Sequence, residues 1–167
     1  ISENISNEYC REVRFETNGR AYFGIGFKND SGGYEIRNPY FKGSSSPKDI
    51  TSIKDGHGSV AVFEGFFDFL SYQTLRENSQ EPMKRDCLIL NSLSFFEKSL
   101  SILESYSDVH LYLDNNAAGH KCTDLALSLG DRFKDERGLY EGFEDQNDFL
   151  LASSNRVEKV KKKGLRY

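Results

Sequence analysis

From residue 59 onward, short apolar segments alternate with longer amphipathic ones, and this alternation limits the possible folds more than any other feature. Three almost wholly apolar segments have the length of strands: 60–63, 87–90 and 109–113. Strands that are buried on both faces of a parallel sheet have this composition. Between them, apolar residues recur at helical spacing, over 66–75 and over 95–106. The pattern predicts an α/β domain whose mainly parallel sheet is flanked by helices.

Further elements are expected toward the end of this domain. Asn115 or Asn116 can cap a helix that ends near Gly130. A weak fourth strand is expected around 138–140 and a short helix at 147–152.

The first third of the chain has a different pattern. Between 11 and 38, apolar and polar residues alternate, and Asn18-Gly19 predicts a tight hairpin turn. The following stretch, 39–58, is rich in Gly, Ser, Pro and Lys and has no clear period, which predicts a loop or linker. We therefore expect a small antiparallel β subdomain with its linker at 1–58, an α/β domain at 59–155 and a basic tail at 156–167.

Charge and cysteine content exclude several classes of protein. The net charge of −4 argues against a broad basic surface that coats nucleic acid, so contacts with phosphates must be local. Cys10, Cys87 and Cys122 lack the spacing of a zinc site or a disulfide framework, which favours a reducing cytoplasm. No apolar run approaches the ~20 residues of a membrane span. The chain begins with Ile1 rather than Met, from which we expect it to be part of a longer protein.

Carboxylates follow two of the predicted strands. Glu64 ends the first, with Asp68 one helical turn later, and Asp114 ends the third. Because the carboxyl ends of parallel strands face one crevice, these side chains should converge there, and Asp145 and Asp148 could approach from the last loop. Oxygen ligands around an open cleft are what Mg²⁺ or Mn²⁺ prefers.

The spacing of these residues resembles a known family. The segments Val60 to Tyr72 (VAVFEGFFDFLSY) and Val109 to Gly119 (VHLYLDNNAAG) resemble the two toprim motifs, and EDQNDFL at 144–150 is similar to a later motif of primase-type toprim domains. The upstream hairpin also resembles the subdomain that precedes toprim in DnaG-type bacterial primases, particularly those of plasmids and conjugative or mobile elements. Two positions depart from the family pattern: Asn116 replaces the second Asp, and Glu144 replaces a Lys.

The resemblance implies a DNA primase core that synthesises RNA primers on single-stranded DNA from nucleoside triphosphates, with Mg²⁺ or Mn²⁺. Its partners would include a replicative helicase, bound through other regions. It gives catalytic roles to Glu64 and Asp114. The expected metal shell is Glu64, Asp68, Asp114, Asn116, Asp145 and Asp148.

A local track of cations should compensate for the acidic cleft. Arg37, Lys42 and Lys48 are the candidates for binding the nucleic acid, because they lie in a Gly/Ser-rich region that can approach phosphates closely. A solvated loop is the alternative for these three. Asn116 could equally be a helix cap, and one of Asp145 and Asp148 an ordinary helix-start residue. Two other functions stay open: a toprim nuclease or topoisomerase fragment, and a catalytically weak nucleic-acid-binding module.

Overall fold

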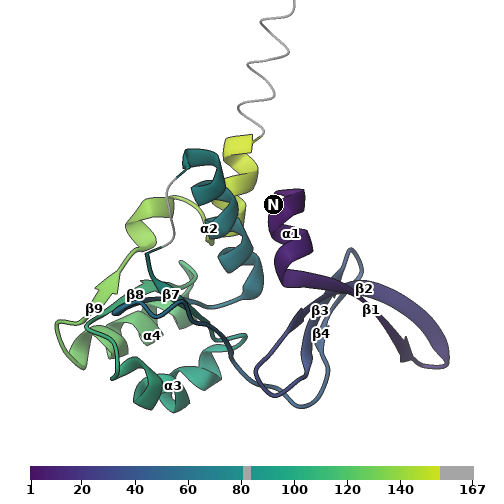
Figure 1. The fold of residues 1–167 in the computed structure, drawn as a ribbon, viewed down its shortest axis with the longest axis horizontal. Coiled ribbons are helices and arrows are strands. Elements are labelled where there is room, and N and C mark those ends of the chain that lie inside the picture. The colour runs from purple at the N-terminus through teal and green to yellow at the C-terminus, as the bar shows by residue number, and fades with distance from the viewer. Residues whose placement is uncertain (81–83, 155–167) are drawn as a thin grey trace, which may run out of the picture.

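The chain folds into two β-sheets that lie side by side, with helices on both faces of the larger one (Figure 1). The computed structural model describes residues 1–80 and 84–154. The smaller sheet has the strand order β1-β2-β3-β4 and the larger one β5-β7-β6-β8-β9. The strands of the smaller sheet are β1 (Cys10–Thr17), β2 (Arg20–Lys28), β3 (Tyr34–Asn38) and β4 (Phe41–Ser44). Those of the larger sheet are β5 (Thr51–Ile53), β6 (Ser59–Phe63), β7 (Asp86–Ile89), β8 (Asp108–Tyr112) and β9 (Phe133–Asp135).

The helices cover the larger sheet from two sides. Above it in Figure 1 lie α2 and the helix at 146–154, with α1 next to α2; below it lie α3 and α4. Their bounds are α1 (Glu3–Tyr9), α2 (Phe66–Ser79), α3 (Phe96–Leu103) and α4 (Ala117–Ser128), with short 3₁₀ helices η1 (Leu93–Phe95) and η2 (Arg137–Tyr140).

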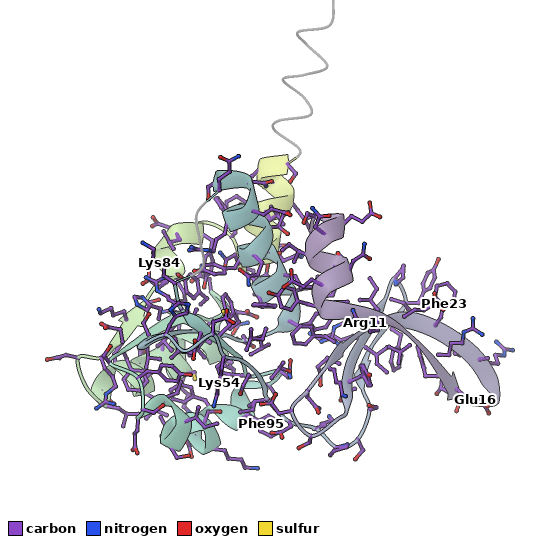
Figure 2. The ribbon with its side chains drawn as sticks, in the orientation of Figure 1. Arg11, Glu16, Phe23, Lys54, Lys84 and Phe95 are labelled. Carbon is purple, nitrogen blue, oxygen red and sulfur yellow. The ribbon has the colours of Figure 1, made fainter. Side chains whose placement is uncertain are left out.

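The small sheet is antiparallel throughout, as predicted. Thr17 pairs with Arg20, so β1 and β2 are joined by the two residues Asn18 and Gly19. Both have positive φ angles, 52° and 72°, which the turn of such a hairpin requires. The hairpin extends beyond the rest of the molecule, and Phe23 on it is 68% exposed (Figure 2).

The large sheet confirms the predicted α/β architecture. Strands β7, β6, β8 and β9 are parallel, and only the edge strand β5 runs antiparallel to its neighbour β7. Successive residues of β6 point to opposite faces. Ala61 and Phe63 join the core formed with α2, while Val60 and Val62 join the core beside α3 and α4.

Two predictions about secondary structure are wrong, and one helix was missed. The stretch predicted as a loop or linker contains β4 and β5, and β5 belongs to the large sheet. The fourth parallel strand is β9 at Phe133–Asp135, whereas the residues expected to form it belong to the 3₁₀ helix η2. Helix α1 was not predicted from the sequence. Each of these elements is short and buries few side chains, so its residue pattern carries little signal.

One hydrophobic core spans the two sheets. Phe27 of β2 stacks on Phe66 of α2, with ring centroids 5.1 Å apart. Ile5 of α1 and Cys10 of β1 belong to the same buried cluster as Phe69. The basic tail expected at 156–167 lies outside the described residues. Within the described part of the chain, no helix is both long and apolar enough to cross a membrane.

Candidate functional site

Glu64 and Asp114 lie next to each other at the carboxyl ends of two central strands of the large sheet. Strands β6 and β8 are parallel neighbours, with Phe63 opposite Tyr112, so the residues that follow them leave the sheet on the same side. The Asp114 backbone N–H donates a hydrogen bond to Glu64 Oε2 at 3.3 Å. The structure thus brings together the two carboxylates that the sequence placed at adjacent strand ends.

Asp68 joins this pair from the first turn of α2. It is only 7% exposed, and it accepts a hydrogen bond from the Asn147 backbone N–H. Its Oδ1 atom is buried and has no hydrogen-bond partner among the residues that the structure describes. An unsatisfied buried carboxylate oxygen is costly, so this atom calls for a positively charged or N–H partner.

The loop that carries Asp145 is held against the end of β8 by hydrogen bonds. Asn115 donates from its backbone N–H to the Glu144 carbonyl at 2.6 Å and from its side-chain Nδ2 to the Phe143 carbonyl at 2.9 Å. The Tyr140 hydroxyl donates to the Leu113 carbonyl at 2.7 Å. These positioning contacts were missed from the sequence, where Asn115 stood out only as a candidate helix cap.

The clustered carboxylates repel one another. Burial, reinforced by the charge of Glu64, raises the pKa of Asp114 to about 7. Burial likewise raises the pKa of Glu64, of Asp145 and, furthest, of Asp68, on which Asp145 and Asp114 also act. The positive charge of Lys42 on β4 partly offsets this effect, because it lowers the pKa of Glu64 and of Asp114. The protein surroundings therefore disfavour the ionised form of all four carboxylates.

Asn116 is the N-cap of α4. Its Oδ1 accepts hydrogen bonds from the backbone N–H groups of Ala118 and Gly119, both at 3.0 Å, and its Nδ2 donates to Asp114 Oδ2 at 3.3 Å. The amide group that faces Asp114 is thus a hydrogen-bond donor rather than a ligand oxygen. A β-carbon on Gly119 would lie 2.0 Å from the Asp114 carbonyl oxygen, so glycine permits the close approach of α4 to this loop.

Asp148 lies further out than the other predicted ligands. It is exposed, and its backbone N–H donates to Asp145 Oδ1 at 2.7 Å. This contact matches a helix-start role, since Asp148 lies in the first turn of the helix at 146–154.

The three predicted nucleic-acid-binding cations differ in their availability. Arg37 lies 3.7 Å from the buried Glu35 and its guanidinium covers the Phe66 ring at 5.4 Å, so it is already engaged. Lys42 and Lys48 are exposed. The charges of both lysines lower the pKa of Glu35, and that of Lys42 also lowers the pKa of Glu64. Of the three, the two lysines are therefore better placed to meet a phosphate chain.

The donor set fits a hard divalent cation. Within 1–80 and 84–154, no three His, Cys, Asp or Glu side chains are already arranged as a ligand group, so binding requires side-chain adjustment. The unpaired Oδ1 of Asp68 and the excess negative charge around Asp114 are what Mg²⁺ or Mn²⁺ would satisfy. Glu64, Asp68 and Asp114 are the residues that would hold the ion, with Asp145 beside them.

A second cleft lies on the α4 side of this cluster, with a volume of about 750 Å³. Asn116 and Glu144 line it together with His120, whose Nδ1 is 2.7 Å from Arg137 Nη1. Arg137 is buried and bound through two nitrogens to Asp135. His120 directly follows Gly119 in the chain, and its ring stabilises the orientation of this arginine.

Two solved structures resemble this chain in fold. One is the primase fragment of the bacteriophage T7 primase-helicase protein, with a TM-score of 0.61 and 16% identity, covering 87% of this chain and 63% of that one. The other contains T7 lagging-strand DNA polymerase interacting with primase domains of two gp4 subunits bound to an RNA/DNA hybrid and dTTP; its TM-score is 0.63 at 16% identity, covering 93% and 83% of the two chains. This chain thus spans about 63% of the length of the T7 primase fragment.

Family models match both parts of the chain. Residues 1–46 match a domain of unknown function, DUF8464, and residues 61–150 match the Toprim-like family. No curated protein sequence matches. The second match covers more than half of the chain and includes Glu64, Asp68, Asp114 and Asp145. The chain therefore belongs to the Toprim-like family and has the fold of a primase-type toprim domain.

Proposed function

We propose that this chain is the catalytic core of a primase-like protein that joins ribonucleotides on a single-stranded DNA template. The observation that carries the proposal is the convergence of Glu64 and Asp114 at adjacent parallel strand ends, with the unpaired Oδ1 of Asp68 beside them. A cluster of carboxylates suits phosphoryl transfer, because it can bind a divalent cation. The same cation then neutralises the negative charge of the reacting phosphates.

In this reaction, Mg²⁺ or Mn²⁺ when bound would neutralise charge on the reacting phosphates and favour ionisation of the attacking hydroxyl. The protein would supply the remaining functions. Glu64 is suited to accept the hydroxyl proton, because its raised pKa makes it a stronger base than an ordinary carboxylate. Asp68 and Asp114 would orient the ion, and Asn115 and Tyr140 would hold the loops that carry these ligands.

The small sheet would guide the template. Lys42 lies on β4, and its positive charge lowers the pKa of Glu64 and of Asp114. Together with Lys48 it would offset the repulsion between a phosphodiester chain and the carboxylate cluster. Arg37 would contribute chiefly by fixing β3 against Phe66. A replicative helicase would bind through other regions of the protein. The reducing cytoplasm is the proposed compartment, in keeping with Cys10, Cys87 and Cys122, which are present as thiols in the structure.

A primer-synthesis assay tests the proposal. Labelled nucleoside triphosphates, single-stranded DNA and Mg²⁺ or Mn²⁺ should give short RNA products, and Glu64→Gln and Asp114→Asn should each abolish them. The exposed Asp131 provides the control, because Asp131→Asn removes the same charge away from the cluster. Product formation that is unaffected by the two site variants would refute the assignment. Template cleavage without synthesis would identify the chain as a toprim nuclease.

One observation favours a second candidate, a nucleic-acid-binding module of low catalytic activity, such as one on a plasmid or other mobile element. The Asn116 oxygen is used to cap α4, so the cluster has one carboxylate fewer than the family motif. In that case the chain should bind single-stranded DNA without making products, and Asn116→Asp should raise its affinity for the metal ion.

A further inference from the structure

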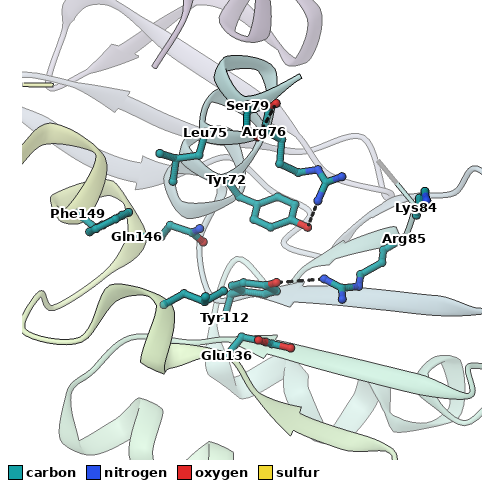
Figure 3. A pocket seen from close by; sticks show the side chains of 11 residues that line it. Tyr72, Leu75, Arg76, Ser79, Lys84, Arg85, Tyr112, Glu136, Gln146 and Phe149 are labelled. Atoms are coloured by element: carbon teal, nitrogen blue, oxygen red, sulfur yellow. Dashed lines mark hydrogen bonds between the residues drawn. The ribbon is translucent and has the colours of Figure 1, made fainter. Parts of the chain in front are cut away.

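A separate cleft of about 680 Å³ opens on the α2 side of the large sheet. It is bordered by α2, by the residues that precede β7, and by segments that follow β9 (Figure 3). None of the four clustered carboxylates lines it. Gln146 does line it, although it directly follows Asp145 in the chain, so the cleft and the carboxylate cluster adjoin the same short segment.

One end of the cleft is cationic. Arg76, Lys84 and Arg85 line this end, and Figure 3 shows them on the same side of it. Arg85 Nη1 donates to the Tyr112 hydroxyl at 3.3 Å. Because a phenol is neutral, this bond orients the guanidinium without cancelling its charge. Of the lining residues that the structure describes, Glu136 is the one carboxylate.

The other end combines apolar surface with an unsatisfied amide. Leu75 and Phe149 lie there beside Gln146 (Figure 3). Gln146 is only 5% exposed, and its Oε1 is buried without a hydrogen-bond partner in the described part of the chain. A buried amide oxygen that faces a cleft needs an N–H donor, and no described protein group supplies one.

We infer that this cleft binds a nucleotide, with its phosphates against Arg85 and Lys84 and the edge of its base against Gln146. Guanidinium and ammonium groups bind phosphate through charge-assisted hydrogen bonds. Leu75 and Phe149 would cover the faces of the base, and its amino or ring N–H group would donate to Gln146 Oε1. The volume falls within the ~300–1,000 Å³ of small-molecule sites. This nucleotide would be bound apart from the reacting one, because Glu64 and Asp114 lie outside the cleft.

Isothermal titration of the full chain with ADP in the presence of EDTA tests this inference. We expect one molecule of ADP to bind, more tightly than either adenosine or inorganic phosphate, since each of these occupies only one end of the cleft. Arg85→Ala and Gln146→Leu should each weaken ADP binding by about tenfold, the effect of losing one strong hydrogen bond. GDP, CDP and UDP, titrated in parallel, give the preference for the base.

Matched controls separate this site from the carboxylate cluster. Lys121→Ala, which removes an exposed cation from α4, and Asp114→Asn should leave ADP binding unchanged. Gln146→Leu should also raise the melting temperature while it weakens binding, because it removes an unsatisfied buried oxygen; a variant that merely unfolds would lower both. The inference is overturned if no nucleoside diphosphate binds, if Arg85→Ala and Gln146→Leu bind ADP like the parent, or if binding requires Asp114. It does not depend on primer synthesis, which tests the proposed function separately.

Discussion

Replacing Asp114 by Asn should stabilise the metal-free protein even though Asp114 belongs to the proposed catalytic group. The pKa of Asp114 is about 7 in the folded chain, against ~3.9 for an unfolded aspartate. The folded state therefore holds the proton more tightly. As pH rises from about 4 to about 7, ionisation of Asp114 lowers the free energy of unfolding, and above about pH 7 the loss is complete. An amide of the same shape never ionises and avoids this loss.

The size of the effect follows from the same pKa. For a fully buried group, a pKa of about 7 would correspond to roughly 4 kcal/mol. Asp114 is only half-buried, so solvent screening reduces the figure to about 1–2 kcal/mol. For a chain of this length, that is a rise in melting temperature of about 3–6 °C. At pH 5 the gain should fall to about one third, because most of the ionisation lies above that pH.

Thermal unfolding followed by circular dichroism in EDTA, near pH 5 and near pH 8, measures the gain. Asp131→Asn is the matched control and should change little at either pH. Excess Mg²⁺ should raise the melting temperature of the parent but not of Asp114→Asn, because the variant lacks the charge that holds the ion. Equal stability of parent and variant at pH 8, or the same gain at both pH values, would show that burial and the neighbouring carboxylates do not raise the pKa of Asp114.

Three further results are expected. Asn116→Asp should tighten Mn²⁺ binding in calorimetry. One carboxylate oxygen can keep the cap of α4 while the other replaces the amide donor beside the cluster. Unchanged affinity would mean that the side chain at position 116 does not reach the ion. The double variant Lys42→Ala, Lys48→Ala should weaken single-stranded DNA binding. The slope of log binding constant against log salt concentration should flatten by about one unit or less for each phosphate that the variant no longer binds. An unchanged slope would place the nucleic-acid path elsewhere. Gly119→Ala should cost about 1–3 kcal/mol in denaturant unfolding, because its β-carbon would meet a backbone carbonyl at 2.0 Å. Gly138→Ala, with no atom within 4 Å, is the control, and equal destabilisation by the two would contradict the packing argument.

The sequence predicted the parts of the fold that have strong local patterns. The apolar strands β6, β7 and β8 and the Asn18-Gly19 turn were recognisable because each carries its own signal of burial or backbone conformation. Strand β5 has three residues and α1 buries only Ile5, so neither presents a period long enough to detect. Strand β9 buries only Phe133, and its position depended on pairing with β8 rather than on its own residues.

The site was predictable to the extent that it follows from parallel strands. Glu64 and Asp114 had to meet once their strands became neighbours. The engagement of Arg37 by Glu35 and Phe66 could not be foreseen, since it depends on how the two sheets pack. The same holds for Gln146, whose buried oxygen is visible only when the surrounding helices are in place. The roles of Glu64 and Asp114 in catalysis and metal binding stay predictions, which the primer-synthesis and metal-binding experiments test.

The stacking of Phe27 on Phe66 links two segments that match different family models. Exchanging the first 46 residues for those of a relative would place that relative's residue at position 27 against Phe66. Phe66 begins α2, two residues after Glu64. Recombination at this boundary should therefore succeed only between relatives whose residues at the two positions have compatible sizes. Covariation between positions 27 and 66 is the expected record of that constraint in the evolution of the family.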